Sequence, residues 1–457
     1  MTATTTASCV LDPSGTGDTT SAEPDDHGCV TVRSHRITTA AGTRSGGASR
    51  IGSGRDHAEE TTAALLLDGS AGPKESAVRY AAVRGSGSHA VRDAVRLAAE
   101  RLGRPWPAPA LAPPPGSALV TRPHPDRQPA ELVEKLLGQL SFDGFEVAAQ
   151  AHVTTESRLL IPAGRTPVGE TVHTGAAVID VLRGDSLVAD VDVAWSGDVL
   201  PDIDQLGARV EQALKRAGAP RRAVPSRVQM LLVDGSAGAL LHEVCGHLLE
   251  SSRQRPSLLA RHRSRQVAHH QLSVDDNPRH DAGFGSHRYT LLGTDTRRRS
   301  LLSAGLLAGL LEDCPHGPWR AEDARRMPQP RMSHLELTPA PCPVTLDRAL
   351  GNARAPIVRV HRLGAGSLDH RDGTVVLEVK DATYVQDSGL QRLPPFRVTA
   401  EARQVLLGIQ AVGGADTMAT WSAYCLATSG RLPVGASTPT VLTGPLTTLE
   451  HGFPTRP

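Results

Sequence analysis

The sequence is poor in aromatic residues and has no long apolar run, and both shortages narrow the kinds of protein it encodes. Phe, Trp and Tyr together make up 3% of the 457 residues. No stretch approaches the roughly 18 apolar residues of a transmembrane helix, so we expect no membrane span. The N-terminus, MTATTTASCVLDPSG, lacks a charged segment followed by an apolar one, so we expect no signal peptide.

An excess of one charge sign is also missing. The 49 Lys and Arg residues are balanced by 48 Asp and Glu residues, for a formal net charge of +1. Because nucleic acids and anionic membranes attract mainly strongly basic surfaces, we expect neither as a partner. The six cysteines are scattered, without a C-x-x-C pair or a disulfide framework. We therefore expect the cytoplasm, where a thiolate stays reduced.

Two common catalytic motifs are absent from the sequence. There is no G-x-S-x-G turn to present a nucleophilic serine. There is also no G-x-x-x-x-G-K-[ST] loop to cradle phosphates. These absences set aside α/β serine hydrolases and P-loop nucleotide hydrolases.

Composition and periodicity predict an α+β chain with three parts. Residues 1–28 are rich in Thr, Ser, Gly and Asp and predict a disordered tail. Residues 29–222 predict an N-terminal α+β domain of α/β type, with a proline-rich connector near 105–117. Residues 223–450 predict a mostly antiparallel β C-terminal domain.

Within these parts, helical and alternating patterns predict individual elements. Helices are expected at 88–102, 129–140 and 201–217. Two or three short strands are expected between 29 and 72, and longer antiparallel strands between 145 and 195. The segment AVPSRVQMLLVD predicts a buried strand that leads directly into the most informative stretch of the chain.

That stretch is DGSAGALLHEVCGHLLESS, residues 234–252, which contains an H-E-x-x-x-H sequence at His242, Glu243 and His247. Ser236 is the expected N-cap. Residues five apart on an α-helix lie roughly 140° apart around its axis, so a straight helix cannot aim both imidazoles at one ion. We predict an i→i+5 bulge or an early break here, which Gly246 permits.

Two histidines and a glutamate on one helix are the parts of a zinc hydrolase. Neutral imidazoles bind the metal, and a carboxylate moves the protons of water. The alternative is that all three are ordinary helix residues. Cys245, about 60° from His242 around the helix, is a further soft ligand or a core residue. A separate group of histidines at 269, 270, 280 and 287 lacks regular metal spacing and is expected on the surface or in loops.

Four blocks of the sequence together resemble the TldD/PmbA family of metallopeptidases in content and order. They are LLHEVCGHLLE, then VDDNP at 274–278, then RRMPQPRMS at 325–333, then AYCLATSGRLPVGASTPT near the C-terminus. The resemblance covers roughly residues 130–445 and is weak before them. It implies a TldD/PmbA-like fold and a metal-bearing, TldD-like subunit.

The resemblance also implies roles for particular residues. His242, His247 and Cys425 become the ligands of Zn²⁺, and Glu243 becomes the catalytic base. Cys245 stays open as a competing third ligand because of its place on the helix, although the family's aliphatic residue at this position favours core packing. Arg331, in a block that borders the family's active-site cleft, is expected to hold a substrate carboxylate or carbonyl. The setting of the cysteine departs from the family's Gly-Cys-Gly-Lys-like pattern, because this chain has Tyr-Cys-Leu-Ala at 424–427.

Three functions follow from this resemblance. The first is zinc-dependent hydrolysis of a peptide bond in an unfolded peptide, with a TldE/PmbA-like partner subunit in a heterodimer. The second is an amide hydrolase recruited to antibiotic biosynthesis, acting on a small peptide-like or acylated intermediate. The third is a non-catalytic assembly subunit with a vestigial metal site.

Overall fold

The computed structural model describes residues 27–449, and a few segments within that range are not described. The predicted disordered tail at 1–28 lies outside the described residues except for its last two, and the predicted connector at 105–117 lies outside them entirely. No described helix is both long and apolar enough to cross a membrane. The segments not described are 46–47, 54–56, 68–77, 85–87, 103–126, 163–164, 198–199, 253–254, 282, 313, 315–316, 323–325, 342–343 and 386–388.

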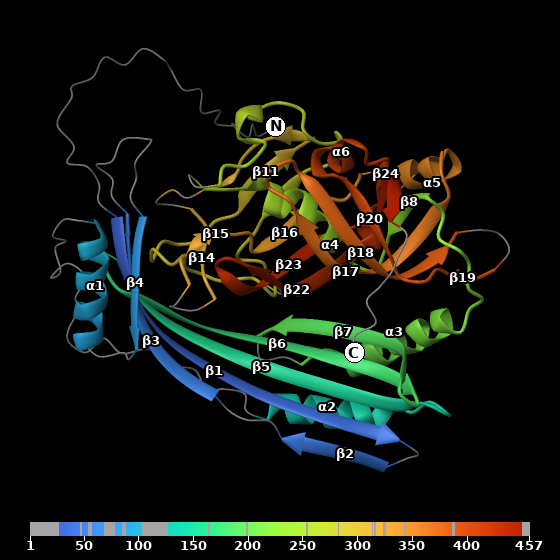
Figure 1. The fold of residues 1–457 in the computed structure, drawn as a ribbon, viewed down its shortest axis with the longest axis horizontal. Coiled ribbons are helices and arrows are strands. Elements are labelled where there is room, and N and C mark those ends of the chain that lie inside the picture. The colour runs from blue at the N-terminus through green and yellow to red at the C-terminus, as the bar shows by residue number, and fades with distance from the viewer. Residues whose placement is uncertain are drawn as a thin grey trace, which may run out of the picture.

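The N-terminal part is one strongly curved antiparallel sheet (Figure 1). Its order is β4-β3-β1-β5-β6-β7, with β2 paired to β1. Every pairing is antiparallel, so the expectation of an α/β-type domain with short early strands is wrong. Strand β1 pairs with β5 along nearly its whole length. This long run of backbone hydrogen bonds stabilises an early strand that is expected to be short from its sequence alone. The strands are β1 (His27–Ser45), β2 (Ala48–Ser53), β3 (His57–Leu67), β4 (Val78–Arg84), β5 (Glu146–Pro162), β6 (Val168–Arg183) and β7 (Ser186–Ser196).

Three helices accompany this sheet within two residues of their predicted positions. They are α1 (Ser88–Leu102), α2 (Gln128–Gln139) and α3 (Ile203–Ala217). The apolar stripe of α2, with Leu132 and Leu136, packs on Ala149 and Ile179 of the sheet. The Asp202 carboxylate caps α3 by accepting from two backbone N–H groups of its first turn. Helix α2 packs on the central strands β1 and β5, α3 packs on β7, and α1 packs on β3 and β4 at the other end of the sheet, while part of the face opposite α2 looks toward the C-terminal half (Figure 1).

The C-terminal part contains a closed five-stranded barrel. Strand β8 pairs with β17 and β24, β24 pairs with β20, β20 with β18, and β18 returns to β17. The buried strand expected before the motif is therefore a barrel strand. The barrel strands are β8 (Arg227–Leu232), β17 (Ile357–Leu368), β18 (Thr374–Tyr384), β20 (Phe396–Glu401) and β24 (Val441–Leu449), with β19 (Gln391–Arg392) on β18 and β21 (Ala411–Val412) on β24.

A second C-terminal sheet has the order β12-β11-β10-β16-β23-β22. Strand β22 is its last member, so one edge of β22 has no strand beside it among the described residues. The strands are β10 (Val274–Asp276), β11 (Arg299–Ser303), β12 (Leu306–Leu307), β16 (His334–Leu337), β22 (Ala419–Ala427) and β23 (Gly430–Thr438). The smaller elements are β9 (Glu250–Ser251), β13 (Leu311–Glu312), β14 (Trp319–Arg320), β15 (Gln329–Pro330), α5 (Val344–Gly351), α6 (Ala402–Leu407) and the 3₁₀ turns Ala260–His262 and Ala415–Thr417. The chain is thus mostly β with some helices.

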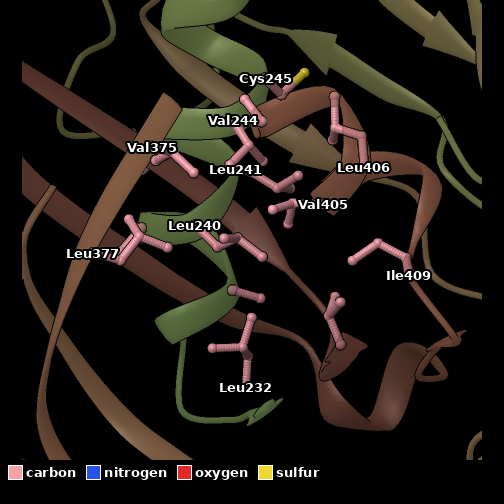
Figure 2. Packing of buried hydrophobic residues seen from close by; sticks show 14 of the residues in the cluster. Leu232, Leu240, Leu241, Val244, Cys245, Val375, Leu377, Val405, Leu406 and Ile409 are labelled. Atoms are coloured by element: carbon pink, nitrogen blue, oxygen red, sulfur yellow. The ribbon is translucent and has the colours of Figure 1, made fainter. Parts of the chain in front are cut away.

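The motif helix lies between the barrel and the second sheet. Helix α4 (Ser236–Leu241) packs against β17, β22 and β23. Figure 2 shows Leu240, Leu241 and Val244 packed among residues of β18 and α6. The expected N-cap at Ser236 is wrong, because Gly235 occupies that position with a φ of 87°. A Cβ on Gly235 would lie 2.9 Å from the Thr420 carbonyl oxygen, so glycine is required for this close entry.

Candidate metal site

The helix that carries the histidines changes its winding at the motif itself. After α4, residues His242–His247 form a π-helix, η2, which has i→i+5 hydrogen bonding. The predicted i→i+5 distortion is therefore confirmed. Wider winding moves residues five apart toward the same side, and the two imidazole rings lie with centroids 4.6 Å apart. Gly246 permits tight packing here, because a Cβ on it would collide with the sulfur of Met332.

Strand β22 brings Cys425 to these two histidines. The ligand atoms of His242, His247 and Cys425 all lie within 4.8 Å of one another. Cys425 Sγ is 3.2 Å from His247 Nε2. The ring of Trp421, also on β22, lies 5.2 Å from the His242 ring and helps to fix it. A helix and an edge strand that are almost 180 residues apart in sequence thus form one cluster of three soft or borderline ligands.

The other candidate ligand, Cys245, points away from this cluster. It is fully buried, and Figure 2 shows its side chain among the apolar residues that pack on the helix. Burial raises the pKa of the Cys245 thiol to about 12, so it is not a thiolate in this setting. Of the two cysteines left open by the sequence, the structure brings only Cys425 to the histidines.

A buried ion pair between Glu250 and Arg331 contacts two of the three candidate ligands, His247 and Cys425. Glu250 Oε2 accepts from His247 Nδ1 at 3.0 Å, and Glu250 Oε1 accepts from Arg331 Nε at 2.8 Å. The Arg331 guanidinium also donates to Cys425 Sγ at 2.9 Å and to Ser429 Oγ at 3.0 Å. Carboxylate–imidazole pairs of this kind fix the tautomer of a metal-binding histidine and leave its other nitrogen free for the metal. Glu250 and Arg331 therefore orient His247 and Cys425.

This placement bears on the expectation that Arg331 holds a substrate group. The Arg331 side chain is 0% exposed, and each of its three nitrogens already donates to a protein atom. Glu250, which sequence reasoning missed, lies three residues after His247. Its spacing of i+3 from a ligand histidine is the signal that could have revealed it.

Glu243 lies beside the cluster and is nearly buried, at 8% exposure. Its Oε1 is 4.0 Å from His242 Nε2. Burial raises the pKa of the Glu243 carboxyl above its ordinary value, a shift in the direction that favours proton transfer. Gly366 of β17 lies directly against it, since a Cβ there would be 2.5 Å from Glu243 Cγ. The glycine-rich segment of β17 therefore leaves room for this carboxylate.

The electrostatics of the cluster match a cation site. Burial lowers the pKa of His242 well below its ordinary value, and the neighbouring positive charges add to this, so the ring is neutral. Burial alone would raise the pKa of Glu250, but Arg331 and His247 outweigh it and lower the value to about 2. Burial alone would lower the pKa of His247, but Glu250 and Cys425 raise it to about 10. Without a cation, a proton on His247 balances the buried negative charge.

The residues present fit a tetrahedral transition-metal ion. Imidazole and thiolate ligands in a two-histidine, one-cysteine set are typical of Zn²⁺. With ligand bonds of about 2.0–2.3 Å, the 3.2 Å between Sγ and Nε2 corresponds to an angle of roughly 95° at the ion, so the two atoms need to separate by only about 0.3 Å to reach tetrahedral angles. The carboxylate on His247 Nδ1 supplies the outer contact that such ligands require.

The four histidines expected on the surface or in loops, at 269, 270, 280 and 287, all lie in loops or turns of the structure. His287 is buried, with its Nδ1 against the Gly285 carbonyl oxygen at 3.1 Å. His280 stacks on His334 with ring centroids 4.1 Å apart. The expectation is confirmed in that all four lie outside helices and strands, although His287 is buried within its loop.

Comparison with known proteins identifies the C-terminal half. Residues 225–448 match the PmbA/TldA metallopeptidase C-terminal domain. No curated protein matches the sequence.

Three solved structures share the fold over nearly the whole chain. TldE from Thermococcus kodakarensis is 13% identical with a TM-score of 0.63, and the match covers 92% of this chain and 97% of that one. A candidate modulator of a DNA gyrase from Thermotoga maritima is 12% identical with a TM-score of 0.66, covering 93% and 96%. Another from Bacteroides thetaiotaomicron is 14% identical with a TM-score of 0.57, covering 92% and 94%. The match extends the fold to the N-terminal sheet, where the sequence resemblance is weak.

Proposed function

Because the chain belongs to the PmbA/TldD metallopeptidase family, we propose that it is a zinc-dependent peptidase that hydrolyses an amide bond beside His242, His247 and Cys425. The observation that carries the proposal is the convergence of these three side chains, with their ligand atoms within 4.8 Å of one another and a carboxylate alongside. Zn²⁺ held there would polarise the amide carbonyl and lower the pKa of water.

The chain's own residues supply the proton transfers. Glu243 is the general base, because its carboxylate lies at the cluster and burial raises the pKa of the carboxyl above its ordinary value. It takes a proton from the attacking water and returns it to the nitrogen of the departing amine. Arg331 and Glu250 are positioning residues in this proposal, since they hold Cys425 and His247 and are too buried to meet substrate.

The substrate proposal rests on the free edge of β22. Two cavities meet this strand, and both are also lined by residues of β7, the last strand of the N-terminal sheet. An extended peptide can add to an exposed strand edge through main-chain hydrogen bonds, without a defined side-chain sequence. An unfolded peptide offers its whole backbone for such pairing, whereas a folded protein offers only exposed edge strands and loops, so we propose an unfolded peptide as substrate.

We further propose that the chain works with a related subunit. Its fold is shared with TldE, and it carries the H-E-x-x-x-H sequence, so it would be the metal-bearing member of a heterodimer. The described cysteines, Cys29, Cys245, Cys314 and Cys425, form no disulfide. Their thiol state agrees with a reducing compartment such as the cytoplasm.

The alternative of an amide hydrolase in antibiotic biosynthesis draws on one observation. Tyr424, beside the ligand cysteine, gives the cavity next to β22 a defined aromatic wall. Such a wall suits recognition of one particular group better than hydrolysis of generic peptides.

The test is the Glu243→Gln variant, which keeps the shape of the side chain and removes the base. We expect it to retain zinc and to lose at least about 100-fold in kcat/KM, the usual contribution of a general base. Hydrolysis of casein-derived peptides, with and without a TldE-like subunit, is followed by mass spectrometry. An active Gln variant would refute the role of Glu243, and a purified wild type without zinc would favour a non-catalytic assembly subunit.

A further inference from the structure

A cavity of about 840 Å³ lies between the N-terminal sheet and the strand that carries Cys425. Residues of β1, β5, β6 and β7 form its floor, and Ser422, Ala423 and Tyr424 of β22 form the facing wall. In Figure 1 these strands face one another across the space between the two halves of the molecule. Cavities of this size accommodate small organic ligands.

The cavity and the metal cluster lie on opposite faces of one edge strand. Successive side chains of a strand point to opposite faces. Cys425 points toward His247, whereas Tyr424 points toward His152 of β5, with Nε2 of the histidine 3.3 Å from the phenolic oxygen. Because β22 ends its sheet, a substrate that lies along the free edge reaches both faces. A group next to the scissile amide can therefore enter the cavity.

The floor of the cavity is open because its residues are small. Ala41, Ala176 and Ala194 line it, together with Val178, which is 42% exposed. Larger residues at these strand positions would fill the space. The side chains paired with Val178 on the adjacent strands are Gln150 and Asp192, so the exposed valine and the three alanines form an apolar patch with a polar border, which favours a largely apolar occupant.

The wall of the cavity is planar and preorganised. The Arg431 guanidinium carbon lies 3.7 Å from the centroid of the Tyr424 ring. The His152 ring stacks on Tyr424 at 5.7 Å, and Phe284 meets it edge-on at 5.0 Å. The Arg431 guanidinium already lies over the Tyr424 ring, so an incoming ring meets this wall through the guanidinium and the His152 imidazole, which both line the cavity.

We propose that this cavity is a specificity pocket that accepts an aromatic group of the substrate, next to the amide bond that is cleaved. The inference rests on the proposed peptidase function and adds the substrate class to it. The pocket selects by burying the ring over the alanine floor and against the wall formed by Tyr424, Arg431 and His152.

The test compares binding of three short peptide amides to the zinc-loaded, full-length protein by isothermal titration calorimetry. They are acetyl-Gly-Gly-amide and its two variants with 2-naphthylalanine at the first or the second position. We expect one naphthyl compound to bind at least tenfold more tightly than the glycine compound. Val178→Trp fills the pocket and should bring the ratio close to one. The matched control, Leu187→Trp on β7, lies outside this cavity and should keep the preference.

Three outcomes separate the pocket from the proposed function. Equal binding of all three compounds to wild type, or a preference that survives in Val178→Trp, overturns the pocket. If Val178→Trp fails to fold by circular dichroism, Ala176→Phe fills the same space and gives the same test. If the naphthyl preference appears and vanishes as expected while no compound or longer peptide is hydrolysed, the pocket stands and the peptidase proposal fails.

Discussion

Replacing Glu250 by Gln should destabilise the protein and loosen the metal site together. Glu250 is 2% exposed and accepts from Arg331 at 2.8 Å and from His247 at 3.0 Å. Glutamine keeps the volume but removes the charge, so the buried Arg331 cation is left without a countercharge. Breaking one side of a buried ion pair costs about 3–5 kcal/mol. Loss of the carboxylate behind a ligand histidine lowers metal affinity by about 10–100-fold.

Two assays check these magnitudes. Urea unfolding of the metal-free protein measures the free energy of unfolding, and competition with a chromogenic chelator measures zinc affinity. Glu211→Gln, an exposed position on α3, is the matched control and should change neither. If Glu250→Gln unfolded and bound zinc like the wild type, the assignment of Glu250 and Arg331 as positioning residues would be wrong.

Four further predictions concern the same site. Gly246→Ala should destabilise the protein by about 1–3 kcal/mol in urea unfolding, because its methyl group collides with Met332, and the added Met332→Ala should restore part of the loss. The pKa of His247 is raised to about 10, so zinc must displace a proton from this histidine when it binds between pH 6 and 9. Zinc affinity should therefore rise about tenfold per pH unit in this range for each proton displaced. Because the pKa of His247 is raised to about 10 in the fold, its protonation stabilises the metal-free protein fully below about pH 6.5, and this contribution is lost as pH rises toward 10. The free energy of unfolding measured at several pH values would show the loss. Cys245→Ser should leave zinc stoichiometry unchanged by elemental analysis, since Cys245 lies in the core, and a loss of zinc without unfolding would contradict this.

The local geometry of the site was accessible from sequence because it follows from helix periodicity. His242 and His247 are five residues apart, so a wider winding or an early break is needed to bring them together, and the π-helix is the wider winding. The helices α1, α2 and α3 were equally predictable from their apolar stripes. In these cases a few consecutive residues carry the whole signal.

Long-range pairing could not be read in the same way. Cys425 reaches His247 only because β22 lies beside the motif helix, and the spacing of the chain does not encode that contact. Arg331 looked like an exposed substrate ligand, yet the fold buries it completely between Glu250 and Cys425. The early strands looked short because small and polar residues interrupt their apolar pattern, and the long ladder with β5 overrides that local signal.

The most direct test of the account is X-ray absorption at the zinc edge, with zinc content by elemental analysis, on wild type and on Cys425→Ser. We predict about one zinc per chain in the wild type, with two nitrogen ligands and one sulfur ligand at about 2.3 Å. The sulfur signal should disappear in the variant. A zinc ion without a sulfur ligand, a sulfur signal that persists in Cys425→Ser, or a wild type that binds no zinc would contradict a metal centre of His242, His247 and Cys425.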